Sequence, residues 1–303
     1  MCRARFQGWT APTRCGEHSM LLIDTCSDLP AGLVEELGVE VLHFPYTFGG
    51  VELRDDFGRT QSHGEFYAAM RAGEHPTTIQ VPRQTFIDVF TRYAAVGEPI
   101  MYLGFSSALS GTFDTAWVAR REVLEQYPDA DIRLVDTKAA AVAEGLLVYE
   151  AARRWRDGMD FDALEVWIAE QRRRLNGWFI VDDLETLRRG GRLNGAVAAA
   201  GTLLDVKPLL HVTSDGRLEL KRSIRGRAKS MRALADLVAE RAADPSSQTI
   251  AVAHADVPDD ADRLKALIEE RVDVADIMTM QTGPVIGAHT GPGMLAVVFW
   301  GEA

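Results

Sequence analysis

Residues 99–137, PIMYLGFSSALSGTFDTAWVARREVLEQYPDADIRLVDT, contain the strand–helix–strand pattern that decides the fold. The apolar run PIMYLGF (99–105) predicts a short buried strand, and TFDTAWVARREVLEQY (112–127) predicts a helix. A second strand, DIRLVDT (131–137), follows the helix. Strands that alternate with helices in this way pair in parallel, because the helix carries the chain back to the starting edge of the sheet.

The same alternation continues toward the N-terminus. MLLIDT (20–25) and VEVLHF (39–44) predict two further buried strands, with a helix at about 30–37 between them. Two helices follow at 62–73 and 82–97, and in the second of these the apolar side chains recur at i, i+3, i+4 and i+7. These elements predict a doubly wound parallel sheet covered on both faces, with any ligand site at the carboxyl ends of its strands.

The second half of the chain has a different pattern. WFIVDD (178–183) predicts a strand, and LETLRRGGR (184–192) predicts a helix that ends at two glycines. NGAVAAAGTLLD (194–205) predicts a helix of small residues, and VKPLLHVTSDGRLELKRSI (206–224) predicts a hairpin with Asp215-Gly216 as its turn. This mixture predicts an α+β domain with a mixed sheet.

We therefore predict three parts of the chain. Residues 1–19 form an N-terminal extension without ordered structure, residues 20–158 form the doubly wound α/β domain, and residues 159–303 form the C-terminal domain. The extension contains arginines but no apolar core, so a secretory signal is not predicted. No run in the chain approaches the roughly 18 uninterrupted apolar residues of a membrane span.

Charge and cysteine content argue against several classes of protein. The net charge of −11 argues against nucleic acid as the main partner. Cys2, Cys15 and Cys26 are too few for a disulfide framework, and a zinc site from Cys2, Cys15 and His18 lacks the paired spacing of metal ligands. Reduced thiols and the missing secretory signal predict a cytoplasmic protein without a bound metal.

A cluster of hydroxyl groups follows the predicted strand at 99–105. The segment SSALSGT (106–112) places Ser106, Ser107 and Ser110 directly before a helix. A helix N-terminus offers unpaired N–H groups and a positive dipole end, and the hydroxyls add further donors. The cluster predicts either a site for a carboxylate or phosphate, or simple N-capping by Ser110.

Two further segments contain residues that suit an anion. His289 lies in the glycine-rich stretch GAHTGPG (287–293), where a loop would let the backbone approach a ligand; the alternative is a turn histidine bonded to backbone. Arg192 belongs to a basic segment that runs from Arg188 to Lys229. It faces either an anion or a partner surface, or it forms a surface ion pair.

Common catalytic fingerprints are missing from the sequence. It contains no GxGxxG after the first strand, no GxxxxGK[ST], no GxSxG and no HExxH. A serine-dependent hydrolase or phosphotransferase that uses Ser107 or Ser110 with His289 is the alternative function, although no spacing supports a triad.

Several blocks of the chain, in order, resemble the DegV family of bacterial fatty-acid-binding proteins, the lipid-binding subunits of fatty acid kinase. The resemblance runs from about Met20 to Phe299. The blocks are LLIDTCSDLP, PTTIQVPRQTF, SSALSGTF, VDTKAAAVAEGLLV, LETLRRGGRLNG, VKPLLHVTSDGRL and GPVIGAHTGPGMLAVVF.

The resemblance implies a role for a cleft between the two domains. A protein of this family would be a non-catalytic carrier without a cofactor. It would bind one long-chain fatty acid and present it to a fatty acid kinase, which makes an acyl-phosphate. The residues implied for the fatty-acid carboxylate are Thr78, Ser106, Ser107, Ser110, His289 and Thr290, and those implied for contact with the kinase are Arg192 and Arg225.

Two residues depart from the family pattern. Ile79 stands where the family usually has a serine after the threonine, and Val81 replaces the proline that follows Gln80. We therefore expect the hydroxyl network around the carboxylate to be one member short.

Overall fold

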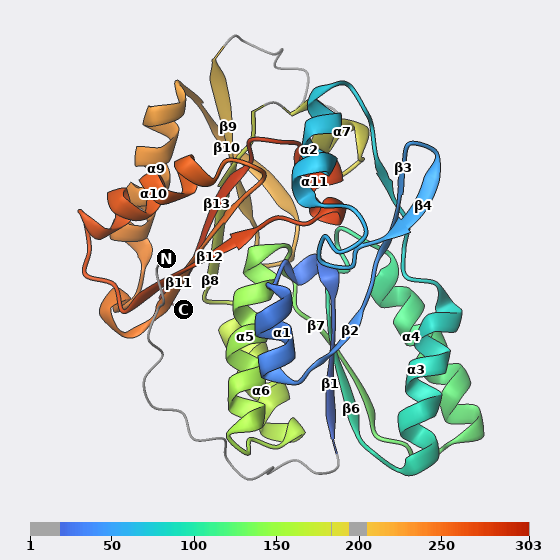
Figure 1. Ribbon diagram of the computed structural model, residues 1–303. Coiled ribbons are helices and arrows are strands. Elements are labelled where there is room, and N and C mark those ends of the chain that lie inside the picture. Colours follow the sequence, from blue (N-terminus) through green and yellow to red (C-terminus); the bar gives the residue numbers. More distant parts are fainter. Residues whose placement is uncertain (1–18, 183, 194–204, 303) are drawn as a thin grey trace.

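A four-stranded parallel sheet forms the centre of the N-terminal half, with strand order β2-β1-β6-β7 (Figure 1). The computed structural model describes residues 19–182, 184–193 and 205–302. All neighbours in this sheet pair in parallel, as the sequence predicted. The strands are β1 (Met20–Asp24), β2 (Glu40–Leu42), β6 (Ile100–Gly104) and β7 (Ile132–Asp136).

Helices cover both faces of the parallel sheet, which confirms the doubly wound arrangement. On one face α3 (Arg83–Val96) and α4 (Thr112–Gln126) share a core with the sheet. On the other face α1 (Ala31–Leu37) and α5 (Val142–Arg156) pack against it (Figure 1). The chain order reverses between β1 and β6, so the segments that follow these two strands meet at a topological switch point.

A small antiparallel sheet, of order β4-β3-β5, lies beside this domain. Its strands are β3 (Pro45–Phe48), β4 (Val51–Arg54) and β5 (Thr77–Thr78), and α2 (His63–Arg71) connects β4 to β5. Tyr46 on β3 pairs with Thr78 on β5. This pairing fixes the backbone of a predicted site residue.

A six-stranded mixed sheet forms the C-terminal half, with order β10-β9-β8-β13-β11-β12. Among the described strands of this sheet, β11 and β12 pair in parallel and all other neighbours pair antiparallel. The hairpin predicted around Asp215-Gly216 is confirmed, and Gly216 has the positive φ of 82° that its turn requires. The strands are β8 (Leu175–Ile180), β9 (Val206–Val212), β10 (Leu218–Arg225), β11 (Thr249–His254), β12 (Asp276–Gln281) and β13 (Leu295–Trp300).

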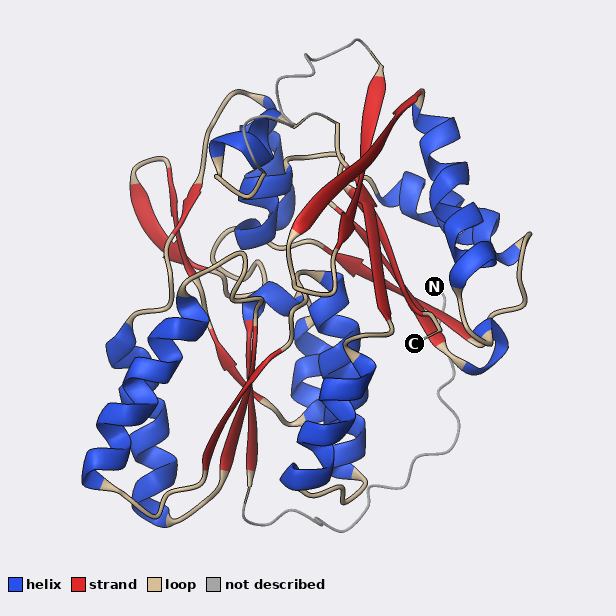
Figure 2. Cartoon of the chain, turned by 180° about the vertical axis from the view of Figure 1, so that it is seen from behind, coloured by secondary structure: helices blue, strands red, loops and turns tan. Residues whose placement is uncertain are grey.

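The two faces of the mixed sheet have different neighbours. One face packs against α9 (Arg227–Arg241) and α10 (Pro258–Glu269). The other face turns toward α5, which also packs against the parallel sheet (Figure 2). Apolar residues of both sheets therefore belong to one continuous core, with α5 at the junction.

Several boundaries differ from the predicted ones. The sequence predicts two long helices, at 139–156 and 161–175. Helix α6 (Phe161–Gln171) ends earlier, because the chain already pairs with β13 from Leu175 onward. Helix α5 begins at Val142, after Ala141 with its positive φ of 54°. The glycine-rich segment expected to be a loop contains a short helix, α11 (Pro284–Thr290). Further short helices among the described residues are η1 (Thr25–Ser27), α7 (Glu185–Arg189) and η2 (Pro245–Ser247).

The structure does not test the prediction for two segments or the predicted domain boundary. The helix predicted at 194–205 and the extension at 1–19 lie outside the described residues, apart from Ser19 and Asp205. The boundary near residue 158 stays an interpretation, since α5 contacts both sheets. Within the described ranges, no helix combines the length and apolar character needed to cross a membrane.

Candidate functional site

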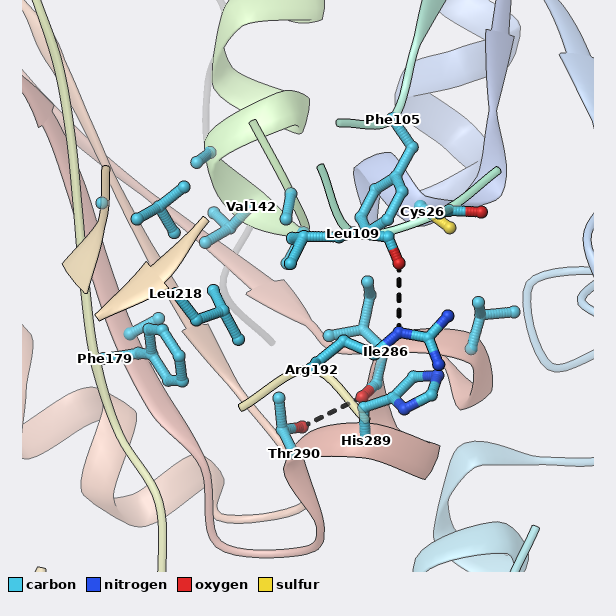
Figure 3. Close-up of a pocket in the computed structure, with 18 of the residues that line it drawn as sticks. Cys26, Phe105, Leu109, Val142, Phe179, Arg192, Leu218, Ile286, His289 and Thr290 are labelled. Carbon is cyan, nitrogen blue, oxygen red and sulfur yellow. Dashed lines mark hydrogen bonds between the residues drawn. The ribbon is translucent and has the colours of Figure 1, made fainter. Parts of the chain in front are cut away.

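A cavity of about 1020 Å³, including its open mouth, lies between the two sheets. Its walls come from the segments after β1 and β6, the start of α5, one face of the mixed sheet, and α11 (Figure 3). Most lining side chains are apolar, as is usual for cavities that enclose a small molecule. The apolar wall includes Cys26, Phe44, Phe105, Leu109, Val142, Phe179, Leu187, Val212, Leu218, Val285, Ile286, Met294, Ala296 and Val298.

Polar side chains gather at one end of the cavity, which we call the polar end. It comprises Thr78, Gln80, Ser110, Arg192, His289 and Thr290. In Figure 3, Arg192 and His289 lie on one side of the cavity, and Phe179 and Leu218 lie on the other. The cavity is therefore amphipathic along its length.

A hydrogen bond between Thr78 and His289 forms the centre of the polar end. Thr78 Oγ1 and His289 Nε2 are 2.9 Å apart, although 211 residues separate them in the sequence. Thr78 is held by β5, and His289 by the last turn of α11. If Nε2 donates to the threonine oxygen, the threonine hydroxyl hydrogen remains available to a ligand.

The His289 imidazole is neutral at pH 7. Burial, with a smaller contribution from the nearby Arg192 charge, lowers its pKa to about 4. Its Nδ1 is buried and has no hydrogen-bond partner among the described residues. The ring packs directly on Gly190, where a Cβ would come within 2.2 Å of Nδ1, so this position requires glycine.

The predicted glycine loop around His289 is wrong, because these residues form helix α11. Pro284 occupies its first turn, where the missing N–H is tolerated, and Gly291 with a φ of 75° ends it. Thr290 Oγ1 donates to the Ile286 carbonyl at 3.2 Å, one turn earlier (Figure 3). The helix thus presents His289 and Thr290 together to the cavity.

Arg192 lies in the cavity wall, whereas the resemblance placed it with Arg225 on a basic surface. Its Nε donates to the Leu109 carbonyl at 3.1 Å, and the guanidinium lies beside His289 (Figure 3). Burial lowers the pKa of Arg192. Within the described part of the chain no carboxylate forms an ion pair with it, so the anion-facing alternative fits the geometry. Arg225 is exposed on β10.

The three serines of segment 106–112 occupy different environments. Only Ser110 lines the cavity, and its Oγ accepts a hydrogen bond from the Thr112 backbone at 3.2 Å. Ser106 is fully buried and donates to the Gly216 carbonyl at 2.9 Å. Ser107 Oγ accepts from Lys138 Nζ at 2.8 Å. Ser106 and Ser107 therefore hold the segment in place instead of lining the cavity.

The geometry gives little support to a serine nucleophile. Among the described residues, no serine hydroxyl is hydrogen-bonded to His289, whose partner is Thr78. No carboxylate in the same ranges orients the imidazole, as an acid–base pair in a catalytic triad requires. The arrangement instead suits a small anionic group next to an apolar chain.

Sequence reasoning missed most of the apolar wall. Cys26 was noted only as a thiol after the first strand, yet its side chain lines the cavity, and burial followed by the charge of Asp24 raises its pKa. Phe179, Ala296 and Val298 lie on strands that are buried on both faces, so their apolar runs carried no alternation that would mark the face toward the cavity. No group of three or more histidine, cysteine or acidic side chains in the described ranges could hold a metal, and the Cys2, Cys15 and His18 combination lies outside them.

The fold and the cavity together define a class: an α/β protein with an amphipathic cavity between its parallel sheet and its mixed sheet. The family model described as "uncharacterised protein, DegV family" matches residues 19–302. The chain therefore belongs to the DegV family, which confirms the resemblance and the fold class predicted from it.

Similar proteins match along nearly their whole length. A DegV domain-containing protein of Clostridium perfringens is 41% identical over 283 residues, covering 93% of this chain and 97% of its own. A solved structure described as fatty acid binding of a DegV family protein from Thermus thermophilus is 29% identical, with a TM-score of 0.82 over 94% of this chain and all of its own. A fatty acid binding DegV family protein of Streptococcus agalactiae is 28% identical, with a TM-score of 0.81 over 94% of this chain and 99% of its own.

Proposed function

We propose that this protein binds one long-chain fatty acid, with the carboxylate at the polar end and the acyl chain along the apolar wall. The observation that carries the proposal is the Arg192 cation beside the Thr78–His289 pair in a mostly apolar cavity. Arg192 donates to the carbonyls of Leu109 and Gly190, but no carboxylate of the described residues forms an ion pair with it. A half-buried cation without a counter-ion is unfavourable until an anion arrives. Each buried methylene of the tail adds about 0.8 kcal/mol, so the tail supplies most of the affinity.

The proposed carboxylate contacts are Thr78, Ser110, His289 and Thr290, with Arg192 as the charged partner. The Thr78 hydroxyl donates to the carboxylate while its oxygen accepts from His289 Nε2. For Ser106 and Ser107, which the resemblance assigned to the carboxylate, we propose an indirect role through the segment that carries Ser110. The related proteins of Thermus thermophilus and Streptococcus agalactiae are described as fatty acid binding, which supports this assignment.

The bound fatty acid would then be presented to a fatty acid kinase in the cytoplasm, and this chain would perform no chemistry itself. The exposed Arg225 on β10 is the proposed contact with the kinase. The Thr78–His289 pair lies beside the half-exposed Ile79, so the carboxylate would be near the mouth of the cavity and within reach of a partner.

Native mass spectrometry of the purified protein, followed by solvent extraction, tests the ligand. We expect one fatty acid per chain, and a phosphorylated metabolite or an empty protein would refute the proposal.

The carrier role is tested separately with a purified fatty acid kinase. Arg225→Ala should leave the bound lipid unchanged and lower the yield of acyl-phosphate. His289→Ala should also lower that yield, through a misplaced carboxylate. A wild-type yield from Arg225→Ala would remove this residue from the kinase contact without affecting the lipid assignment.

A further inference from the structure

One residue from each of four neighbouring strands forms a row at the apolar end of the cavity. Leu218 on β10 pairs with Val212 on β9, Val212 pairs with Gly177 on β8, and Gly177 pairs with Val298 on β13. All four line the cavity. The row therefore crosses the mixed sheet as a continuous strip of the cavity wall. Leu218, at one end of the row, lies on the side away from Arg192 and His289 (Figure 3).

Gly177 is the one member of this row without a side chain, and its backbone does not require glycine. It is absent from the residues of positive φ. A Cβ built there would contact Ala143 Cβ on α5 at 3.4 Å and Val212 Cγ2 at 3.5 Å. An alanine would thus just fit, but the atoms of a larger side chain would extend into the cavity, since Ala143 and Val212 occupy the other directions.

Leu218, at the β10 end of the row, also borders the apolar end of the cavity. It is half-buried on the edge strand β10, and its side chain lies in the cavity near Phe179 (Figure 3). In the described ranges β10 is the edge strand of the sheet and pairs only with β9. A smaller residue at 218 would lengthen the cavity in the direction of the row.

We propose that this row sets the longest acyl chain that the protein accepts, with Gly177 and Leu218 as the two residues that determine length. The proposal rests on the proposed binding of a fatty acid. Gly177 leaves space that the end of the chain fills, and Leu218 limits that space. Substitutions at the two positions should shift the preferred chain length in opposite directions.

The test offers an equimolar ladder of straight-chain saturated fatty acids to each delipidated protein, and mass spectrometry identifies the acids retained. Gly177→Val should shift the retained distribution to fatty acids that are about two carbons shorter, because the valine side chain occupies a comparable volume of the cavity. Leu218→Ala should shift it to longer acids by about two carbons, because three carbon atoms are removed. Leu220→Ala is the matched control, since Leu220 lies on the same strand but does not line the cavity.

The outcomes separate the two proposals. A wild-type protein that retains no fatty acid refutes the proposed function itself. Stoichiometric retention with an unchanged distribution in Leu218→Ala refutes the row as the limit of length. If Gly177→Val does not fold, Gly177→Ala replaces it, and the expected shift is then smaller. An unchanged distribution of retained acids in both Gly177→Ala and Leu218→Ala again overturns the inference.

Discussion

The two ends of the cavity are built in different ways. At the apolar end, regular strand pairing places Leu218, Val212, Gly177 and Val298 in one row, and α5 faces them. The polar end is assembled from a two-residue strand, a segment after α7 and a seven-residue helix, which are distant in the sequence. Regular structure thus shapes the space for the ligand, and irregular segments supply its specific contacts.

The largest expected effect follows from a charge at the apolar end. Val212→Asp places a carboxylate where the acyl chain should lie, so retention of fatty acid should fall by at least about a hundredfold. Quantitative extraction and mass spectrometry measure the loss. Val166→Asp, at a position on α6 that is 59% exposed, is the control and should retain the wild-type amount. Equal retention by both variants would show that the apolar end is not occupied.

Removal of the charge at the polar end should have a smaller effect. Arg192→Gln keeps a hydrogen-bond donor but removes the cation, so we expect affinity to fall by about thirtyfold, as for the loss of a hydrogen bond to a charged group. Titration with a fluorescent fatty acid gives the affinity. The control is Arg188→Gln, because Arg188 is exposed and paired with Glu185. If Arg192→Gln binds with wild-type affinity, Arg192 does not contact the carboxylate, and contact with a partner protein becomes the better interpretation.

Loss of the Thr78 hydroxyl should weaken fatty acid binding less than loss of the Arg192 charge. Thr78→Val preserves the shape of the side chain, and we expect about a tenfold loss of affinity with the fold intact. Thr77→Val is a closely matched control, because Thr77 is the exposed neighbour on the same strand β5. If the two variants bind alike, Thr78 does not contact the carboxylate.

The smallest effect on binding is expected from Asp55, which supports the polar end without lining it. Its carboxyl lies near Gly283, the residue before α11, and burial raises its pKa from 3.8 to about 7. The folded state therefore holds this proton more tightly than the unfolded state, so stability falls as pH rises from about 4 to about 7. Asp55→Asn removes this dependence and should raise the free energy of unfolding at pH 8 on the order of 2 kcal/mol.

Urea unfolding at pH 5 and pH 8 measures this difference. At pH 5 the Asp55→Asn variant and the wild type should differ little, because the wild-type carboxyl is then protonated in the folded state. Asp129→Asn, at an exposed position, should follow the wild type at both values. A gain in stability at pH 5 equal to that at pH 8 would contradict the assignment of the raised pKa. Fatty acid retention should not change.

The apolar framework was largely predictable from the sequence. Periodic apolar residues identified strands β1, β6 and β7 and helices α3 and α4, because burial and hydrogen bonding act on these segments locally. The hairpin at Asp215-Gly216 was predictable for a similar reason, since its turn requires the positive φ that glycine adopts. These elements also fixed the position of the switch point between β1 and β6.

The polar end was harder to predict, because tertiary contacts determine it. Helix α11 contains glycine and has little helix propensity, but Gly287 lets Tyr67 approach closely, and the Tyr67 hydroxyl donates to the Thr282 carbonyl. Segment 106–112 offered three serines with the same local sequence signal. Which of them reaches the cavity depends on partners from distant segments, such as Gly216 and Lys138.

The position of β13 in the mixed sheet has a consequence for how the chain folds. It follows β11 and β12 in the sequence, yet it lies between β8 and β11 and joins the two halves of the sheet. In the described ranges β8, β9 and β10 form one antiparallel unit and β11 and β12 form a parallel pair, and strand pairing joins the two units only through β13. The sheet closes only when β13 inserts, a step of high contact order that is expected to be slow. A ribosome-bound chain that lacks β13 should therefore be unable to hold a ligand, and loading becomes a post-translational event.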